Sequence, residues 1–228
     1  MKKKIIITGG SGRFGKFLKS YSSKYKLLFP TKKELNILNE KNIQIYLNTN
    51  KPDILIHLAG LSRPMKIHTE NITKSIDLNI IGTANITKAC SRSNIKLIYF
   101  STNYVYPGSR GNYKERDPLL PVNNYAWSKL GGEASVQLYK NSLILRVCMT
   151  EKPFIHKTAF ANVKTSFIYH EDIAKILFKL LNKKGIINVG GKAQFIYNFA
   201  KMFNPKVKKM SAQNKLPRNI SMKLTKMN

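Results

Sequence analysis

Apolar residues in the first 150 positions fall into short runs that alternate with amphipathic stretches. The runs predict strands, because the strands of a parallel sheet are buried on both faces. These strands are expected at 4–8, 26–29, 52–58, 97–100 and 142–147. Helices are expected between them, at 14–21, 39–47, 72–91 and on a segment after Pro121 that includes 125–129. The alternation indicates the α/β class, with a doubly wound parallel sheet of the Rossmann type.

The rhythm loosens after residue 147. A helix is predicted over 171–181, a strand over 185–189 and a second helix over 193–203, followed by a polar, basic tail. We therefore expect a Rossmann domain at 1–147 and a short lobe at 148–228. The lobe is expected to interleave with the last Rossmann elements, so that the two form a single structural unit.

A glycine-rich turn, Gly9-Gly10-Ser11-Gly12-Arg13-Phe14-Gly15, directly follows the first predicted strand. Glycines at 9, 12 and 15 permit a tight turn, the close approach of a pyrophosphate and close packing of helix on strand. The pyrophosphate would lie at the N-terminus of the following helix. The order of strand, glycine turn and helix therefore predicts a dinucleotide site.

The end of the second predicted strand bears on the choice of dinucleotide. It reads Pro30-Thr31-Lys32-Lys33, with no carboxylate before Glu34. An acidic residue at this place binds the ribose 2′-hydroxyl of NAD, whereas cations suit a 2′-phosphate. We expect NADP(H) to be preferred, with Arg13 as a further cation, and NAD(H) stays open. A solvated lysine loop is the alternative interpretation.

Tyr125 and Lys129 are spaced to lie on one helix face, one turn apart. The ammonium would favour the phenolate, so that the tyrosine could exchange a proton nearer neutral pH. Thr102 comes at the carboxyl end of the fourth predicted strand, the edge at which open α/β sheets bind ligands. Its hydroxyl could hold a substrate oxygen against the phenol. His57 lies on an apolar strand, where we expect a hydrogen-bonded core histidine rather than a general base.

Composition narrows the classes of partner. The formal net charge is +29, from 40 lysines and arginines against 11 acidic residues. A nucleic acid or an anionic membrane would suit such a charge. The lysines are scattered, however, so we expect a lysine-rich solvated surface and no nucleic-acid partner.

We also expect a cytoplasmic protein without a signal peptide, because no apolar run approaches twenty residues. Cys90 and Cys148 lack metal-ligand spacing, so reduced core thiols and no metal site are expected.

Taken together, these stretches resemble the extended short-chain dehydrogenase/reductase superfamily, and within it the dTDP-4-dehydrorhamnose reductase group. The resemblance covers essentially the whole chain, and the order of the motifs is more specific than any one of them. It is carried by the residues 8–15, 35–37, 57–60, Asn79, 101–106 and 121–133, with weaker echoes at 145–146, 170–174, 188–191 and 217–219.

The resemblance implies a role for each matching residue. Tyr125 would protonate the substrate carbonyl oxygen, Lys129 would lower the pKa of Tyr125 and hold the nicotinamide ribose, and Thr102 would bind the reacting oxygen. The implied cofactor-binding residues are Gly9, Gly12, Arg13, Phe14, Gly15, Thr31, Lys32, Asn36, Ala59, Gly60, Asn79, Ser101, Tyr125 and Lys129. The implied substrate-binding residues are Ser62, Asn103 and Tyr104.

Three departures from the pattern concern the substrate and the adenine. Asn103 and Asn36 stand where the group usually has aspartate. Only about two dozen residues separate Arg146 from His170, where the group has a longer substrate segment. The expected lobe is therefore shortened.

The expected function is reduction, by NAD(P)H, of a 4-keto or 4-keto-6-deoxy sugar attached to a nucleoside diphosphate. One alternative is an NAD-dependent sugar-nucleotide 4-epimerase or dehydratase. Another is a non-catalytic, NADP-binding regulatory subunit. A homodimer is suggested by analogy alone.

Overall fold

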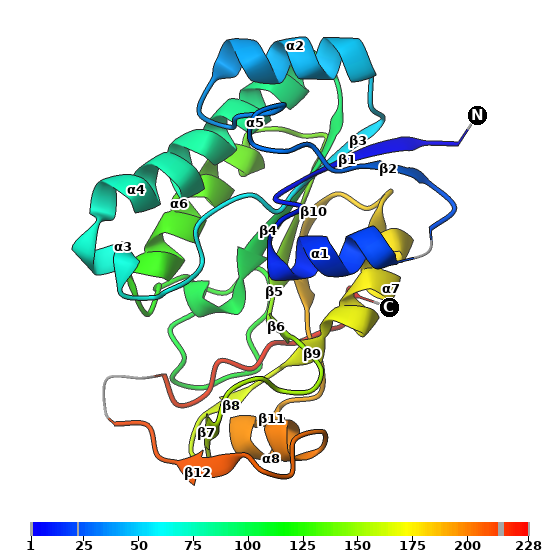
Figure 1. The fold of residues 1–228 in the computed structure, drawn as a ribbon. Coiled ribbons are helices and arrows are strands. Elements are labelled where there is room, and N and C mark those ends of the chain that lie inside the picture. Colours follow the sequence, from blue (N-terminus) through cyan, green and yellow to red (C-terminus); the bar gives the residue numbers. More distant parts are fainter. Residues whose placement is uncertain (1, 22, 214–216, 228) are drawn as a thin grey trace. The chain divides into compact units, whose positions relative to one another are not determined.

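The computed structural model describes residues 2–21, 23–213 and 217–227. Its largest sheet, whose strands are labelled in Figure 1, has six strands. The strand order is β10-β5-β4-β3-β1-β2. β1 pairs in parallel with β2 and β3, and β3 with β4, which confirms the predicted Rossmann-type sheet. The strands are β1 (Lys4–Thr8), β2 (Lys26–Leu28), β3 (Ile54–His57), β4 (Lys96–Thr102), β5 (Ser142–Val147) and β10 (Gly185–Val189).

The helices begin and end largely where the pattern predicts. Asn39 caps α2 by accepting a hydrogen bond from the Asn42 N–H at 2.9 Å, and Lys51 ends α2 in the left-handed conformation. The helices are α1 (Arg13–Ser20), α2 (Glu40–Asn50), α3 (Ile67–Glu70), α4 (Ile72–Ile76), α5 (Gly82–Arg92), α6 (Asn124–Gln137), α7 (His170–Leu180) and α8 (Ile196–Lys201).

One predicted helix, over 72–91, is interrupted. A π-helical turn over Asp77–Ile81 separates α4 from α5. Single π turns occur mostly within α-helices and often at functional sites. The helix predicted over 193–203 is shorter than expected, because Gln194 and Phe195 form the strand β11 instead.

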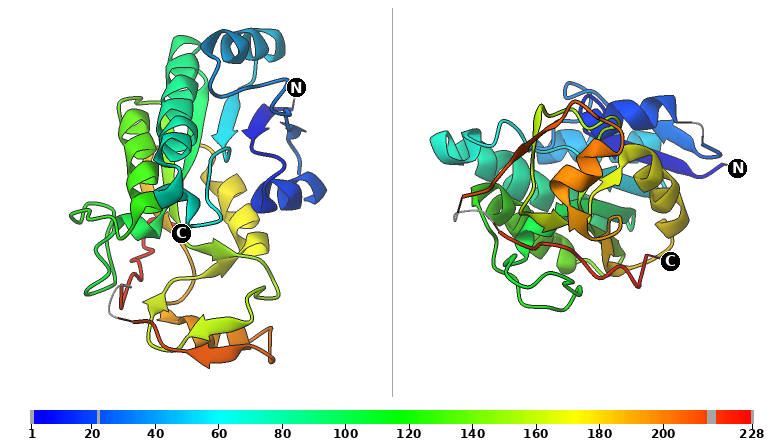
Figure 2. Two further views of the ribbon diagram at one scale, coloured as in Figure 1. Left: turned by 60° about the vertical axis from the view of Figure 1, so that its left-hand side comes forward. Right: turned by 90° about the horizontal axis from the view of Figure 1, so that it is seen from below.

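Contacts divide the chain into two compact units. Unit 1 comprises Met1–Ser101, Trp127–Ile144 and Lys183–Gly185, and unit 2 comprises the rest. In unit 1, the residues Ile5, Ile6 and Ile7 of β1 are fully buried, as a central parallel strand requires. Helices α5 and α6 lie side by side on one face of the strands, and α1 lies on the other (Figure 2).

Unit 2 has several short strands that the sequence pattern did not predict. β6 (Met149–Thr150) pairs with β9 (Ile168–Tyr169), β7 (Thr158–Phe160) with β12 (Lys208–Met210), and β8 (Lys164–Thr165) with β11. Runs of two or three residues are too short to show a period.

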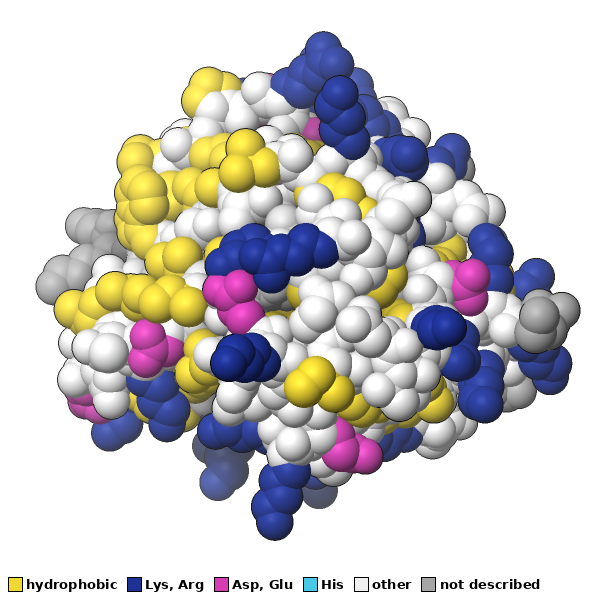
Figure 3. Space-filling model, turned by 90° about the horizontal axis from the view of Figure 1, so that it is seen from above, with side chains coloured by type: hydrophobic (Ala, Val, Ile, Leu, Met, Phe, Trp, Pro, Cys, Tyr) yellow, Lys and Arg dark blue, Asp and Glu magenta, His cyan; other side chains and the backbone are white. Residues whose placement is uncertain are grey.

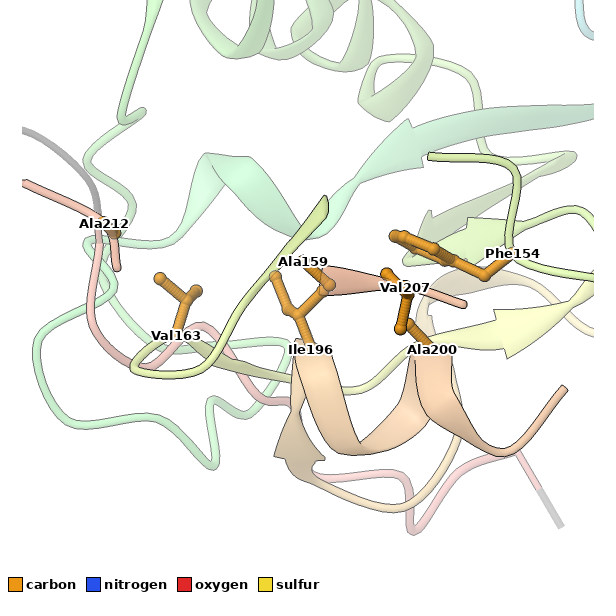
Figure 4. Packing of buried hydrophobic residues seen from close by; sticks show 7 residues of the cluster. All are labelled: Phe154, Ala159, Val163, Ile196, Ala200, Val207 and Ala212. Carbon is orange, nitrogen blue, oxygen red and sulfur yellow. The ribbon is translucent and has the colours of Figure 1, made fainter. Parts of the chain in front are cut away.

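Unit 2 also has a small apolar core. Figure 4 shows Ile196 and Ala200 of α8 facing side chains from the strands and loops around them. The buried members of this core are Phe154, Ala159, Val163, Ile196, Ala200, Val207 and Ala212. The short C-terminal lobe therefore buries hydrophobic surface of its own.

The segment after Pro217, expected to be a polar tail, is built into unit 2. The Tyr113 N–H donates to the Ser221 carbonyl at 3.0 Å, and the Lys223 N–H donates back to the Tyr113 carbonyl at 2.8 Å. Ile220 and Met222 are buried. Ser221 between them is buried as well, so three consecutive residues of this segment are inside the fold, which its polar composition concealed. The expected tail also includes residues 214–216, which lie outside the described residues.

The cations are dispersed on the face of the molecule that Figure 3 shows. Lysine and arginine side chains there lie among neutral and hydrophobic ones rather than in one continuous patch. The expectation of a lysine-rich solvated surface without a nucleic-acid partner stays a prediction.

The buried hydrogen bonds of the Asn188 side chain are expected to stabilise unit 2. Its fully buried amide accepts from the Tyr106 hydroxyl at 2.7 Å and donates to the Tyr113 carbonyl at 2.9 Å. Asn188→Ala removes the acceptor of the Tyr106 hydroxyl and one of the two donors to the Tyr113 carbonyl, so we expect a loss of about 1–3 kcal/mol in the free energy of unfolding by urea. Asn48→Ala, on the exposed face of α2, is the control and should cost under about 0.5 kcal/mol. Equal losses in the two variants would contradict the interpretation.

Candidate active site

The glycine turn after β1 is as tight as its sequence predicts. Gly9 has a φ of +75°, and a Cβ atom there would come within 2.6 Å of the Ala59 nitrogen. A Cβ on Gly15 would come within 2.4 Å of the Gly9 carbonyl oxygen. The Gly12 N–H closes the turn by donating to that same oxygen at 2.9 Å. Larger residues at 9 and 15 would push β1, α1 and the end of β3 apart.

The turn leads into the N-terminus of α1 in a way that fits a pyrophosphate. Gly12 occupies the cap position and has no side chain to satisfy the first backbone N–H groups of the helix. Phe14 is buried against Phe100, with ring centroids 5.5 Å apart, and Arg13 is exposed. The backbone donors and the helix dipole suit a bound dinucleotide.

The loop after β2 is folded on itself. The Thr31 N–H and hydroxyl both donate to the Glu34 carboxylate, at 2.7 and 2.8 Å. These hydrogen bonds hold the pKa of Glu34 below its ordinary value. Lys32 is exposed, and Asn36 uses its side-chain oxygen to accept from the Leu38 N–H at 3.1 Å. The hydroxyl of Thr31 is thus engaged within the loop, and a role of the lysines at a 2′-phosphate stays a prediction.

The loop after β3 is held by Asn79, which lies in the π-helical turn. The Asn79 amide donates to the Leu61 carbonyl at 2.8 Å and accepts from the Leu61 N–H at 2.7 Å. It also donates to the Ser128 hydroxyl of α6 at 2.8 Å. Asn79 is therefore placed to position the loop that carries Ala59 and Gly60. Its partner Ser128 was missed by the sequence analysis, and serine in a helix gives no signal of such a role.

Lys129 is buried, with 9% of its surface exposed. Its ammonium lies 4.1 Å from the centroid of the Tyr99 ring, and the Tyr99 hydroxyl donates to the Lys129 carbonyl at 3.0 Å. Burial lowers the pKa of Lys129 to about 7, and the negative charge of Glu133 acts in the opposite direction. The lysine is thus poised to change its charge near neutral pH.

Glu133 is fully buried and accepts a hydrogen bond from the Ser101 hydroxyl at 2.7 Å. The sequence analysis missed both Glu133 and Tyr99 as site residues. The spacing of four residues from Lys129 to Glu133 was the available signal, but it is common on exposed helix faces.

His57 is the hydrogen-bonded core histidine that its strand predicts. Its ring nitrogens contact the hydroxyls of Thr8 at 2.8 Å and of Thr83 at 3.2 Å. Burial, with a smaller effect of the Lys129 charge, lowers the pKa of His57 to about 3. The imidazole is therefore neutral at physiological pH.

The residues expected around the substrate differ in exposure. Thr102 is buried, and its hydroxyl accepts from the Tyr104 N–H at 3.3 Å. Asn103 is buried and donates to the Thr165 hydroxyl at 3.1 Å and the Ile220 carbonyl at 3.3 Å. Tyr104 is half-buried, and Ser62 is exposed in the loop after β3.

Several of the expected site residues therefore come together within unit 1, namely the glycine turn with Ala59, Asn79 with the loop at Gly60, and Lys129 with the end of β4. Tyr125 lies one turn before Lys129 on α6. Thr102 directly follows Ser101 on β4. The chemical role of each residue stays a prediction.

The sequence matches a known protein family. A family model described as the RmlD substrate binding domain matches residues 2–150. The chain belongs to this family.

The expected place in the extended short-chain dehydrogenase/reductase superfamily is confirmed with it. A dTDP-4-dehydrorhamnose reductase from Aggregatibacter actinomycetemcomitans is 28% identical, over 86% of this chain and 72% of that protein. A dTDP-4-dehydrorhamnose reductase structure from Bacillus anthracis, in complex with NADP, has a TM-score of 0.86 and 25% identity, and the match covers 97% of this chain and 90% of the other.

A second kind of relative matches a smaller share of the chain. Methionine adenosyltransferase 2 subunit beta from Xenopus laevis is 29% identical, over 64% of this chain. The chain spans 46% of the length of that relative.

The neutral state of His57 predicts part of the pH dependence of stability. The folded chain has a pKa near 3 for this group, against about 6.5 for an unfolded histidine. Between these values the unfolded chain binds a proton that the folded chain excludes, so stability falls as the pH falls. His57→Gln should remove up to about 1.4 kcal/mol per pH unit of this slope. The measurement is urea unfolding from pH 7 to pH 4, and parallel curves for the two proteins would refute the prediction.

Proposed function

We propose that this chain is an NADPH-dependent reductase of a 4-keto sugar, or a 4-keto-6-deoxy sugar, attached to a nucleoside diphosphate. The observation that carries the proposal is the helix α6, on which a buried Lys129 follows Tyr125 by one turn in a chain of this family. The reductase relative, which aligns with most of the chain, and the likeness to a reductase bound to NADP support it.

Each group has a defined part in the proposed reaction. Tyr125 gives its proton to the carbonyl oxygen as the alcohol forms. The charged Lys129 lowers the cost of the phenolate that remains. The Thr102 hydroxyl accepts from the Tyr104 N–H, so its own proton can be donated to the same carbonyl oxygen. When bound, the reduced nicotinamide supplies the hydride.

The proposed cofactor is NADP(H) in preference to NAD(H). Arg13, Lys32 and Lys33 are exposed near the glycine turn and after β2, and they supply positive charge for a 2′-phosphate. Glu34 acts against this preference through its own negative charge, although its two hydrogen bonds from Thr31 tie it to the loop. NAD(H) is retained as the weaker ligand.

The alternatives have less support. A 4-epimerase or dehydratase would use the same tyrosine and lysine but retain the cofactor, and the lysines after β2 favour the phosphorylated dinucleotide. For the non-catalytic subunit, the relative that is named as a subunit, methionine adenosyltransferase 2 subunit beta, matches a smaller share of the chain than the reductase relative does. A retained Thr102, Tyr125 and Lys129 also argues for catalysis.

The setting that we propose for the reductase is the cytoplasm, where reduced thiols are the rule. Among the described residues, no helix is long and apolar enough to cross a membrane. Cys90 and Cys148 are buried, and burial raises the pKa of both thiols. We propose that the enzyme acts in the cytoplasm on a sugar nucleotide and has no nucleic-acid partner. A homodimer is suggested by analogy.

Tyr125→Phe tests the proton donor. Because the variant keeps the ring and loses only the hydroxyl, we expect NADPH oxidation with 4-keto-6-deoxy sugar nucleotides to fall by about 10²–10⁴ in kcat/KM. Binding of NADPH should persist. Tyr197→Phe, whose hydroxyl contacts Lys201 on α8, is the matched control and should retain activity. Substantial turnover by Tyr125→Phe would reject the assignment.

The cofactor preference is tested by removing the cations after β2. In Lys32→Ala with Lys33→Ala, we expect the Kd of NADPH to rise about tenfold, because about 1.4 kcal/mol of attraction to the 2′-phosphate is lost. The Kd of NADH should stay within twofold. Calorimetric titration of each nucleotide measures both values, with Lys41→Ala on α2 as the control. Equal weakening for the two nucleotides would contradict a role at the 2′-phosphate.

A further inference from the structure

A buried carboxylate lies beside the proposed catalytic lysine and has no part in the roles assigned so far. Glu133 has none of its surface exposed. Burying a carboxylate costs free energy unless charges or hydrogen bonds compensate for it. One compensating hydrogen bond comes from the Ser101 hydroxyl, at 2.7 Å. A buried glutamate does not help to keep a helix surface soluble, so its presence here indicates another role.

The helix α6 places this carboxylate one turn after Lys129. Tyr125, Lys129 and Glu133 are spaced by four residues each, which puts them along one stripe of the helix. Lys129 is thus flanked by the phenol on one side and the carboxylate on the other.

Two further described groups that act on or contact Lys129, Tyr99 and His57, carry no negative charge. Tyr99 offers the face of its ring, at 4.1 Å. His57, whose ring stacks on Tyr99 with centroids 6.0 Å apart, is neutral, because burial lowers its pKa to about 3. Glu133 adds a negative charge that favours the charged form of Lys129, the ring face of Tyr99 favours it as well, and burial opposes both.

We propose that Glu133 is a positioning residue that keeps Lys129 charged and, through Ser101, ties α6 to the end of β4. Ser101 immediately precedes Thr102 on that strand. One side chain would therefore set both the charge of the lysine and the attachment of its helix to the strand that bears the threonine. The effect on catalysis rests on the proposed reductase function; the effect on Lys129 does not.

Two variants separate the two parts of this role. Glu133→Gln keeps an oxygen that can accept from Ser101 and removes only the negative charge. Ser101→Ala removes the hydrogen bond and keeps the charge. Lys129→Met serves as the background in which no ammonium is present to respond.

The first measurement is stability against pH, made without any ligand. The pKa of Lys129 is about 7 in the folded chain and about 10.4 when unfolded, so stability rises with pH between these values. In Glu133→Gln the pKa of Lys129 in the folded chain moves lower. The free energy of unfolding of this variant therefore keeps falling as the pH drops below 7, where that of the wild type no longer changes through Lys129.

The expected result is a gap between wild type and Glu133→Gln that widens as the pH falls from 8 to 5.5. Each unit by which the pKa of Lys129 is lowered should add up to tenfold to the change in the unfolding equilibrium constant. Ser101→Ala should shift the curve by the same amount at every pH. In the Lys129→Met background, Glu133→Gln should lose its pH dependence.

The second measurement is the pH profile of NADPH oxidation with a 4-keto sugar nucleotide. The alkaline limb should move to lower pH by at least about one unit in Glu133→Gln, because the lysine then loses its proton earlier. Ser101→Ala should lower kcat and leave the limb in place. If Glu133→Gln does not fold, Glu133→Asp keeps the charge, and its alkaline limb should lie within about half a unit of that of the wild type.

A pH-independent stability gap between wild type and Glu133→Gln would overturn the proposal, as would an unchanged alkaline limb. So would a limb displaced by more than about one unit in Glu133→Asp. A wild-type protein that oxidises no NADPH with any of these sugars would refute the reductase function, while the ligand-free measurement would still decide the role of Glu133.

Discussion

A lysine ammonium inside the fold is the constraint around which unit 1 is built. An ammonium loses most of its hydration on burial, and the surroundings must offset that loss or the group gives up its proton. Lys129 meets an aromatic face on Tyr99 and a carboxylate on Glu133, and its neighbour His57 stays neutral. These arrangements are only partly sufficient, since the lysine changes charge near pH 7. A group held so close to its titration point responds to small changes nearby.

The backbone of α6 packs closely against its neighbours at Gly132. A Cβ atom on Gly132 would come within 2.4 Å of the Asn79 carbonyl oxygen and 2.8 Å of the Tyr99 hydroxyl. The helix can therefore approach the π-helical turn and β4 closely. Asn79 then links that turn to the loop after β3 and to Ser128, the residue before Lys129. Through these contacts the position of the lysine depends on three segments that are far apart in the sequence.

Much of this could be predicted from local pattern, and the remainder depends on distant partners. The β-branched run at Ile5–Ile7, the glycine turn and the strand at 142–147 carry their own signals, because period and turn chemistry are local properties. The strands of two or three residues in unit 2 exist only through pairing with distant segments, so no window of sequence reveals them. No local sequence pattern predicts the π-helical turn either. Glu133 looks like any surface glutamate until Ser101 is seen to face it, and Asn188 gives no hint of the carbonyls it bonds.

The segment 218–223 has a consequence for how the protein is made. Its hydrogen bonds to Tyr113 and Lys164 join residues separated by more than fifty positions. Strands β1 to β4 can pair while the ribosome is still adding later residues, but the loop after β4 cannot reach its final arrangement until residue 223 has been added. Non-local contacts of this kind slow folding, because distant parts of the chain must meet before any stabilisation is gained. During synthesis the region next to Thr102 would therefore be among the last to reach its final arrangement.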